Sequence, residues 1–242
     1  MITLRLHTIL LLRCNRNRSP THTMTLQSVS RGLSLLLLCL AMSAANAQPE
    51  SDLSLNAQML AGARQGDTAL VERALAKGAA PDSRNRLGKT VLLMAAEKGD
   101  LALAEKMLKA GADVNLAAIN GVTPLMAAAY AGSLPMVQRF LAAGAQTGAE
   151  DRLHKTAIVY AAGQGHTAIV ELLLDTGIDV NAAYEHRLTV LMWAAGQGHA
   201  ELVKRLRVRG ARVDARDDRG LTAADMAREA GKAKVVAALA AS

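Results

Sequence analysis

The sequence predicts an all-α solenoid of six stacked units with no substantial sheet, and three series of residues spaced 33 positions apart predict it. One glycine series runs through Gly78, Gly111, Gly144, Gly177 and Gly210. A second comprises Gly66, Gly99, Gly132, Gly165, Gly198 and Gly231, and a threonine series comprises Thr90, Thr123, Thr156, Thr189 and Thr222. A fixed period of this length is typical of arrays in which each unit buries its apolar face against its neighbours.

The first half of a unit is predicted to be a short helix, as residues 85–117 illustrate. Thr90 is a favourable N-cap, and residues 91–97 carry small and apolar side chains at helical spacing. Gly99 follows where a helix ends in a left-handed turn.

The second half is predicted to be another helix followed by a loop. Asp100 caps residues 101–110, and Gly111 ends this run. Residues 112–121 then form an extended, turn-rich connection to Thr123 of the next unit. Each unit is therefore expected to be helix, tight turn, helix and projecting loop.

Four segments carry a family pattern: Gly121-Val-Thr-Pro-Leu-Met-Ala-Ala-Ala129, Gly165-His166, Glu171-Leu-Leu-Leu174 and Gly177-Ile-Asp-Val-Asn181. With them the chain resembles the ankyrin repeat. The resemblance covers residues 52–242 as six units, with the bounds 52–84, 85–117, 118–150, 151–183, 184–216 and 217–242.

The chain departs from the Thr-Pro-Leu-His motif of that family. The proline is kept only at Pro124, and its equivalents are Val91, Ala157, Val190 and Ala223. The histidine is replaced by Leu93, Met126, Val159, Met192 and Asp225. Proline at the first helical position is favourable but dispensable, so the helices are still expected to form.

Two irregularities test this register. Pro135 falls in the first turn after Ser133, where proline is tolerated. Arg207 occupies a slot expected to be part of the core, because the equivalents are Leu75, Leu108, Leu141 and Leu174. Either its stem packs while its charged head reaches solvent, or this unit is distorted and exposes a basic surface.

Residues 1–47 are expected to be a secretory signal peptide. Arg31 precedes the apolar run 33–42, and an Ala-x-Ala sequence ends at Ala47. The apolar run is too short to span a bilayer, which needs about 20 residues. The mature chain is then expected to begin at Gln48, with residues 48–51 as a short linker.

Met24 opens a signal peptide of ordinary length by itself, so residues 1–23 look superfluous. A functional extension is the alternative. Cys39 lacks the preceding small residue that a lipoprotein cleavage site requires, so lipidation is not expected.

Removing this leader changes the charge of the chain. All 21 acidic residues lie after Ala47, whereas five of the 28 basic ones lie before it, which leaves 23 against 21 and a net charge of +2 in place of +7. The pI of about 9.7 is then no argument for a nucleic-acid partner. Both cysteines, Cys14 and Cys39, also lie in the leader, so no disulfide framework is expected.

The form of the leader is bacterial. Together with the absence of a membrane anchor it favours the periplasm of a Gram-negative cell, and export to the medium or secretion from a eukaryotic cell is the alternative. We expect a monomer.

The sequence offers no catalytic constellation, cofactor site or metal site. His166 and His199 are expected to start helices, since each follows a turn glycine. His154, His186 and Glu185 fall on successive loop tips, where a solvated tip is the expected state and a metal site the alternative. Asp217 and Asp218 are interpreted as turn residues, and an enzyme is not expected.

The resemblance implies that loop tips and first helices line a concave face, where partners of such arrays bind. Tyr160 and Trp193 hold the same position in consecutive first helices, and Tyr130 is near the end of the preceding one. These three are predicted to form an aromatic ladder with Tyr184 at its edge. The alternative is that Tyr160 and Trp193 fill the core. The predicted polar rim consists of Arg86, Lys89, Arg152, Lys155, Glu185, His186 and Arg187.

A second candidate surface is a basic cluster free of acids in that stretch: Lys204, Arg205, Arg207, Arg209 and Arg212. A solvated face is the usual meaning of such a run, and docking to an acidic partner or an anionic membrane is the alternative.

The sequence therefore favours an exported, non-catalytic adaptor that binds another protein through the concave face. The exported bacterial ankyrin proteins that it resembles are associated with protection against peroxide stress, for instance by supporting a periplasmic catalase. The alternative function is a secreted or host-directed effector that docks through the basic cluster.

Overall fold

The computed structural model of the chain describes residues 54–240. These residues form twelve α-helices, one short 3-10 helix and, within that range, no strand. The predicted all-α solenoid is confirmed. The predicted signal peptide, the alternative start at Met24 and the linker 48–51 lie outside the described residues.

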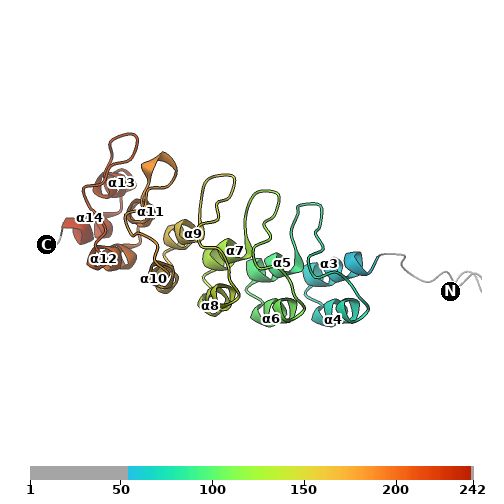
Figure 1. Cartoon of the computed structure of the whole chain (residues 1–242). Helices are drawn as coiled ribbons and strands as arrows, with labels where there is room; N and C mark the ends of the chain where they lie inside the picture. The colour runs from blue at the N-terminus through green and yellow to red at the C-terminus, as the bar shows by residue number, and fades with distance from the viewer. Residues whose placement is uncertain (1–53, 241–242) are drawn as a thin grey trace, which may run out of the picture. The chain divides into compact units, whose positions relative to one another are not determined.

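The helices follow one another as pairs, one pair for each unit (Figure 1). The pairs are α3 (Leu55–Gln65) and α4 (Thr68–Ala76), α5 (Val91–Lys98) and α6 (Leu101–Lys109), α7 (Pro124–Ala131) and α8 (Leu134–Ala142), α9 (Ala157–Gln164) and α10 (Thr167–Asp175), α11 (Val190–Gln197) and α12 (Ala200–Val208), and α13 (Ala223–Glu229) and α14 (Ala233–Ala240). The 3-10 helix η1 (Glu185–Arg187) lies in the loop before α11. In Figure 1 the first helices lie between the projecting loops and the second helices.

The predicted caps delimit these helices. The hydroxyl of Thr90 accepts a hydrogen bond from the backbone N–H of Leu93 at 3.2 Å, and Thr189 caps α11 in the same way. The carboxylate of Asp100 accepts from Leu103 N–H at 3.0 Å, and Gly99 between the two helices has a left-handed backbone. Helices α5, α9, α11 and α13 form without the family's proline, as expected.

The core runs between the two rows of helices. In the second helices one register position is fully buried in successive units, by Met107, Phe140, Leu173 and Leu206. The first helices bury pairs of alanines such as Ala128 and Ala129, whose small side chains allow neighbouring helices to approach closely. The apolar face of each unit is therefore covered by its neighbours, as the 33-residue period predicts.

The two irregular residues fit without distortion. Pro135 lies in the first turn of α8, which remains regular. Arg207 is half-buried within the regular helix α12, and its Nη1 donates to the backbone carbonyl of Ala238 in α14 at 2.6 Å. Its head is thus held by the next unit, and neither sequence-based alternative describes it fully. The equivalent leucines pack in or on the core as expected: Leu174 is buried, and Leu75, Leu108 and Leu141 are partly buried against it.

Asparagine side chains in the segments that follow the second helices tie neighbouring units together. The Oδ1 atom of Asn115 accepts from Gln146 N–H at 2.9 Å, and its Nδ2 donates to the carbonyl of Gly144 at 3.2 Å. Asn181 makes the equivalent pair with Arg212 N–H and the carbonyl of Gly210, at 2.8 and 3.1 Å.

The corresponding position between units 3 and 4 is Gly148, which has no side chain to make this pair. The 33-residue register places Gly177 and Asp179 where those partners lie in the other units. Among the described residues, the N–H of Asp179 has no hydrogen-bond acceptor.

The projecting loops share one backbone position with a left-handed conformation. Gly88, Gly121 and Gly220 hold it with φ of 73°, 85° and 78°. His154 and Arg187 hold the same position in units 4 and 5, with φ of 51° and 58°. The loop of unit 5 has a second left-handed residue, His186, within η1.

No helix in the range 54–240 combines the length and the apolarity needed to cross a membrane.

Candidate functional site

Two register positions of the first helices follow one side of the array, and we call the side that they line the first-helix groove. Residues three apart on a helix share a face, so both positions of a unit lie together. The first position holds Met94, Ala127, Tyr160, Trp193 and Met226, and the second holds Glu97, Tyr130, Gly163, Gly196 and Glu229.

The structure brings the predicted aromatic residues together along this groove. The rings of Tyr130 and Tyr160 meet edge to face, with centroids 5.9 Å apart and planes at 88°. The ammonium of Lys155 lies 4.9 Å from the ring centroid of Trp193 and 6.0 Å from that of Tyr160. The ladder is therefore Tyr130, Tyr160, Lys155 and Trp193, with a cation that the sequence analysis had placed only on the rim.

Tyr160 and Trp193 each have a buried and an exposed side. Both are half-buried and pack against the core, whereas Tyr130 is 55% exposed. The prediction that Tyr160 and Trp193 line the groove and the alternative that they fill the core therefore both apply to these two side chains.

The hydroxyl of Tyr160 fixes the loop of unit 4 to its first helix. It donates to Oδ2 of Asp151 at 2.5 Å, and Asp151 as a whole is only 6% exposed. The other oxygen, Oδ1, accepts from the N–H groups of Leu153 and Lys155 at 2.8 and 2.9 Å. Burial and the carboxylate of Asp151 raise the pKa of Tyr160. The loop that carries Lys155 is thereby held at the edge of the groove.

Three hollows follow the groove. A hollow of about 270 Å³ opens beside Tyr130 and Tyr160, where Ala127 is small. One of about 280 Å³ lies between Trp193 and Met226, where Gly196 has no side chain. Their positions follow from small residues standing where neighbouring units have large ones.

A smaller hollow of about 100 Å³ lies on the loop side of Trp193. Tyr184 and Lys155 line it, together with residues of the loop tips of units 4 and 5. Tyr184 is half-buried there, and burial raises its pKa. Its predicted place at the edge of the ladder agrees with this position.

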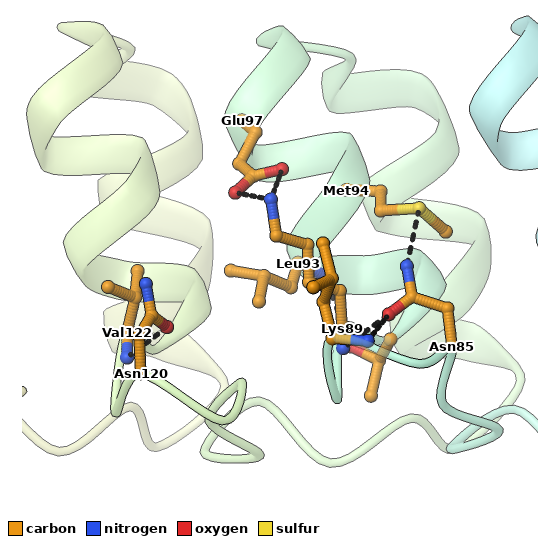
Figure 2. A network of polar contacts seen from close by, with 9 residues as sticks. Asn85, Lys89, Leu93, Met94, Glu97, Asn120 and Val122 are labelled. Carbon is orange, nitrogen blue, oxygen red and sulfur yellow. Dashed lines mark hydrogen bonds and ion pairs between the residues drawn. The ribbon is translucent and has the colours of Figure 1, made fainter.

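The predicted rim residues differ in how they are paired. Lys89 forms an ion pair with Glu97, which lies on the first helix of the same unit, with Nζ to carboxylate oxygen distances of 2.6 and 2.9 Å (Figure 2). Arg86, Arg152 and Arg187 pair with no carboxylate in the described part of the chain.

The loop-tip histidines pair with nearby acids. His154 Nδ1 lies 2.9 Å from Glu150, which raises the pKa of this imidazole. His186 lies 3.7 Å from Glu185 and 3.6 Å from Asp218. In residues 54–240, no group of three or more histidine, cysteine or acidic side chains is arranged to hold a metal ion.

His166 and His199 have a structural role that sequence analysis missed. Each occupies the N-cap position of a second helix, as expected, but its ring also reaches back to the preceding unit. His166 Nε2 lies 3.1 Å from the carbonyl of Tyr130, and His199 Nε2 lies 2.9 Å from that of Gly163. Their recurrence at the 33-residue interval was the available signal.

The basic cluster of unit 5 is surrounded by acids from other positions. Lys204 and Arg205 face Glu201 at 3.8 and 3.7 Å. Arg209 contacts Glu171 and Asp175 of the preceding unit at 3.0 and 2.8 Å.

The remaining two members of the cluster are also engaged. Arg212 lies 3.5 Å from Asp214, and Arg207 is bonded to α14. The cluster is acid-free in sequence but not in space, so its positive charge is largely compensated.

Two family models match the chain, and both are described as ankyrin repeats. The one described as three copies matches residues 58–151 and 92–184, and the one described as many copies matches residues 173–227. The matches together span residues 58–227, which is more than half of the chain. No curated protein gives a match.

Proposed function

The chain belongs to the ankyrin-repeat family, and from this premise we propose that it is an exported, non-catalytic adaptor that binds a partner protein through the first-helix groove. Ankyrin repeats indicate a protein–protein interaction module. The export, the periplasmic location, the monomeric state and the choice of surface are parts of the proposal.

The observation that carries the proposal is the ladder of Tyr130, Tyr160 and Trp193 between open hollows. Aromatic side chains are enriched among the residues that dominate binding energy, and they act best beside pockets that a partner can fill. Four of the five aromatic residues of the chain lie at this groove, and the fifth, Phe140, is fully buried.

The mechanism is presentation of a preformed surface. The loop of unit 4 is fixed by Asp151 and Tyr160, and the helices below it pack on a continuous core. A surface that is already ordered loses little conformational freedom when it binds, so more of the contact energy appears as affinity.

Site-specific photo-crosslinking in the cell tests the proposed surface. A photoreactive amino acid replaces Tyr130 in the full chain, and a control replaces Val208 in a second helix, which is 84% exposed. We expect a discrete protein adduct from position 130 that is absent from position 208. Adducts of equal yield from both positions, or from 208 alone, would place the interaction elsewhere.

Cell fractionation with N-terminal sequencing tests the export. We expect the protein in the periplasmic fraction, beginning at Gln48. An unprocessed protein in the cytoplasm would contradict this part. A role in peroxide defence rests on the resemblance to exported ankyrin proteins, and survival of a deletion strain in hydrogen peroxide measures it.

A further inference from the structure

Units 2 and 4 carry the same loop lysine but differ at the residue that neutralises it. Lys89 and Lys155 are 66 residues apart, which is two periods, and so are Glu97 and Gly163. In unit 2 the loop lysine forms an ion pair with Glu97, near the C-terminal end of α5 (Figure 2). In unit 4 the position of that glutamate is Gly163, so the internal counter-ion is missing.

The space for a carboxylate is present in unit 4. A Cβ atom built on Gly163 has no neighbour within 4 Å, and this helical glycine does not have a left-handed backbone. The ammonium of Lys155 lies over the rings of Tyr160 and Trp193 and pairs with no carboxylate of the described residues. The indole Nε1 of Trp193 is buried and donates to no acceptor within this same range. The ammonium of Lys155 and this indole N–H thus both lack an acceptor among the described residues.

The charges around the groove show the same imbalance. Four acids on this side are engaged: Glu97 by Lys89, Glu150 by His154, Asp151 by Tyr160, and Asp217 by Arg219. Glu229, which lines the hollow beside Met226, forms no ion pair among the described residues. The cations of the loop edge are not, since Arg86, Arg152, Lys155 and Arg187 pair with no acid in residues 54–240.

We propose that the groove binds an extended acidic segment of the partner protein, and that one carboxylate of this segment occupies the place over Gly163 that Glu97 occupies in unit 2. This carboxylate pairs with Lys155, and apolar side chains of the segment fill the hollows beside Tyr130 and Trp193. The inference rests on the proposed function and adds the chemistry of the partner.

A polypeptide fits these features better than a nucleic acid does. The unmatched cations lie in units 2, 4 and 5, so they offer separated points of charge and no continuous basic track. The hollows of about 270 and 280 Å³ lie beside mainly apolar and aromatic residues, which suits aliphatic or aromatic side chains.

Three substitutions at one position separate charge from bulk. Gly163→Glu supplies the counter-ion from within, Gly163→Gln adds nearly the same volume without charge, and Gly163→Lys adds a cation. All three replace a glycine in a helix, so none is expected to lower the helical content, which circular dichroism checks. Lys155→Met removes the cation and keeps an unbranched apolar side chain.

The binding assay uses selected peptides as probes. A library of random 12-residue peptides displayed on phage is selected on the protein purified from cells that express the full chain. The enriched peptides are then labelled with fluorescein and titrated by fluorescence polarisation. Trp193 is the single tryptophan of the chain, so its emission reports independently on occupancy of the groove.

We expect enriched peptides with more acidic than basic residues and at least one aromatic or aliphatic residue. Gly163→Glu and Lys155→Met should each weaken binding about tenfold, while Gly163→Gln has a much smaller effect and Gly163→Lys none or a gain. Binding should also weaken as salt increases.

Four outcomes would overturn the inference. These are enrichment of peptides without an acidic excess, an equal loss in Gly163→Gln and Gly163→Glu, no enrichment that depends on these residues, or equally strong and equally variant-dependent binding of a single-stranded oligonucleotide. Cross-links from position 130 together with non-acidic peptides would leave the adaptor function intact and remove only the acidic segment. Absence of cross-links would reject the adaptor function itself.

Discussion

Gly148→Asn is expected to stabilise the array, because it restores a contact that two other junctions have. Asn115 and Asn181 each bond a backbone N–H and a carbonyl of the following unit, whereas Gly148 leaves the junction of units 3 and 4 without this pair. A Cβ atom on Gly148 has no neighbour within 4 Å, and its φ is not positive. By the 33-residue register, the new side chain should accept from Asp179 N–H and donate to the carbonyl of Gly177.

The size of the effect follows from two contributions. Each of the two hydrogen bonds is exposed in the other junctions and should contribute about 0.5 kcal/mol, the low end for neutral pairs. Replacing a glycine that has an ordinary backbone conformation contributes about 0.5 kcal/mol more, by restricting the unfolded chain. The total of about 1.5 kcal/mol corresponds to a rise in Tm of roughly 3–6 °C for a domain of this size.

The assay is thermal and urea unfolding of the purified protein, followed by circular dichroism. Asn181→Gly is the matched control, since it removes the same pair from the next junction and should lower the stability by a similar amount. A crystal structure of the Gly148→Asn protein would show the two new bonds directly.

A specific result would refute the reasoning. If Asn181→Gly lowers the stability by about 1.5 kcal/mol while Gly148→Asn leaves it unchanged, then the units are not interchangeable at this position. A contact seen at one junction could then not be used to predict the equivalent contact at another junction from the 33-residue register.

Three further predictions concern the ends and the loops of the array. Tyr160→Phe removes a donor from the buried carboxylate of Asp151 and keeps the ring packing, so the free energy of unfolding should fall by about 1.5 kcal/mol in urea titrations. Arg207→Ala removes the bond to the carbonyl of Ala238, so amide exchange in α14 should become several-fold faster. The Thr222 hydroxyl and backbone N–H and the Arg228 guanidinium lower the pKa of Asp225 from 3.8 to about 2. The stabilisation of the fold by this carboxylate is therefore complete above about pH 4 and is lost as the pH falls through 2. Asp225→Asn should flatten this pH dependence of the urea midpoint.

The first two of these have a matched control, and the third has a contradicting outcome. Tyr130→Phe alters an exposed ring in the same groove and should leave the stability unchanged, so an equal loss in both variants would exclude the buried carboxylate as the cause. Lys204→Ala removes a neighbouring exposed charge and should not affect exchange in α14. The same midpoint profile for Asp225→Asn and the unaltered protein between pH 5 and 2 would contradict the third prediction.

Much of the fold could be predicted because its signals are local. Thr90 and Asp100 cap helices by bonding to residues three positions later, and Gly99 has the left-handed conformation that its place between two helices requires. Local capping of this kind depends on short-range geometry alone, and the fixed period then repeats it in each unit.

The state of the charges could not be predicted, because ion pairs join residues that are distant in sequence. Arg209 belongs to an acid-free run, yet its guanidinium contacts Glu171 and Asp175 from the preceding unit. Lys155 shows the opposite case. It was predicted to lie on the rim, but its ammonium lies over the ring of Trp193. The 33-residue register contained a signal for this difference, since Gly163 stands where unit 2 has Glu97. The signal could not be used from the sequence alone, because the ion pair between Lys89 and Glu97 has to be known first.

The left-handed residues of units 4 and 5 have a consequence for how the groove responds to an occupant. His154, His186 and Arg187 hold a conformation that costs a residue with a Cβ atom about 1 kcal/mol or more relative to glycine. The free protein therefore stores conformational strain in the loops beside Lys155, and less in the glycine-bearing loops of units 2, 3 and 6. A backbone rearrangement that relieves this strain needs less free energy here than elsewhere in the array. The bond from Tyr160 to Asp151 holds the loop of unit 4, so we expect the loop of unit 5, with its two left-handed residues, to be the adaptable part of an otherwise rigid receptor.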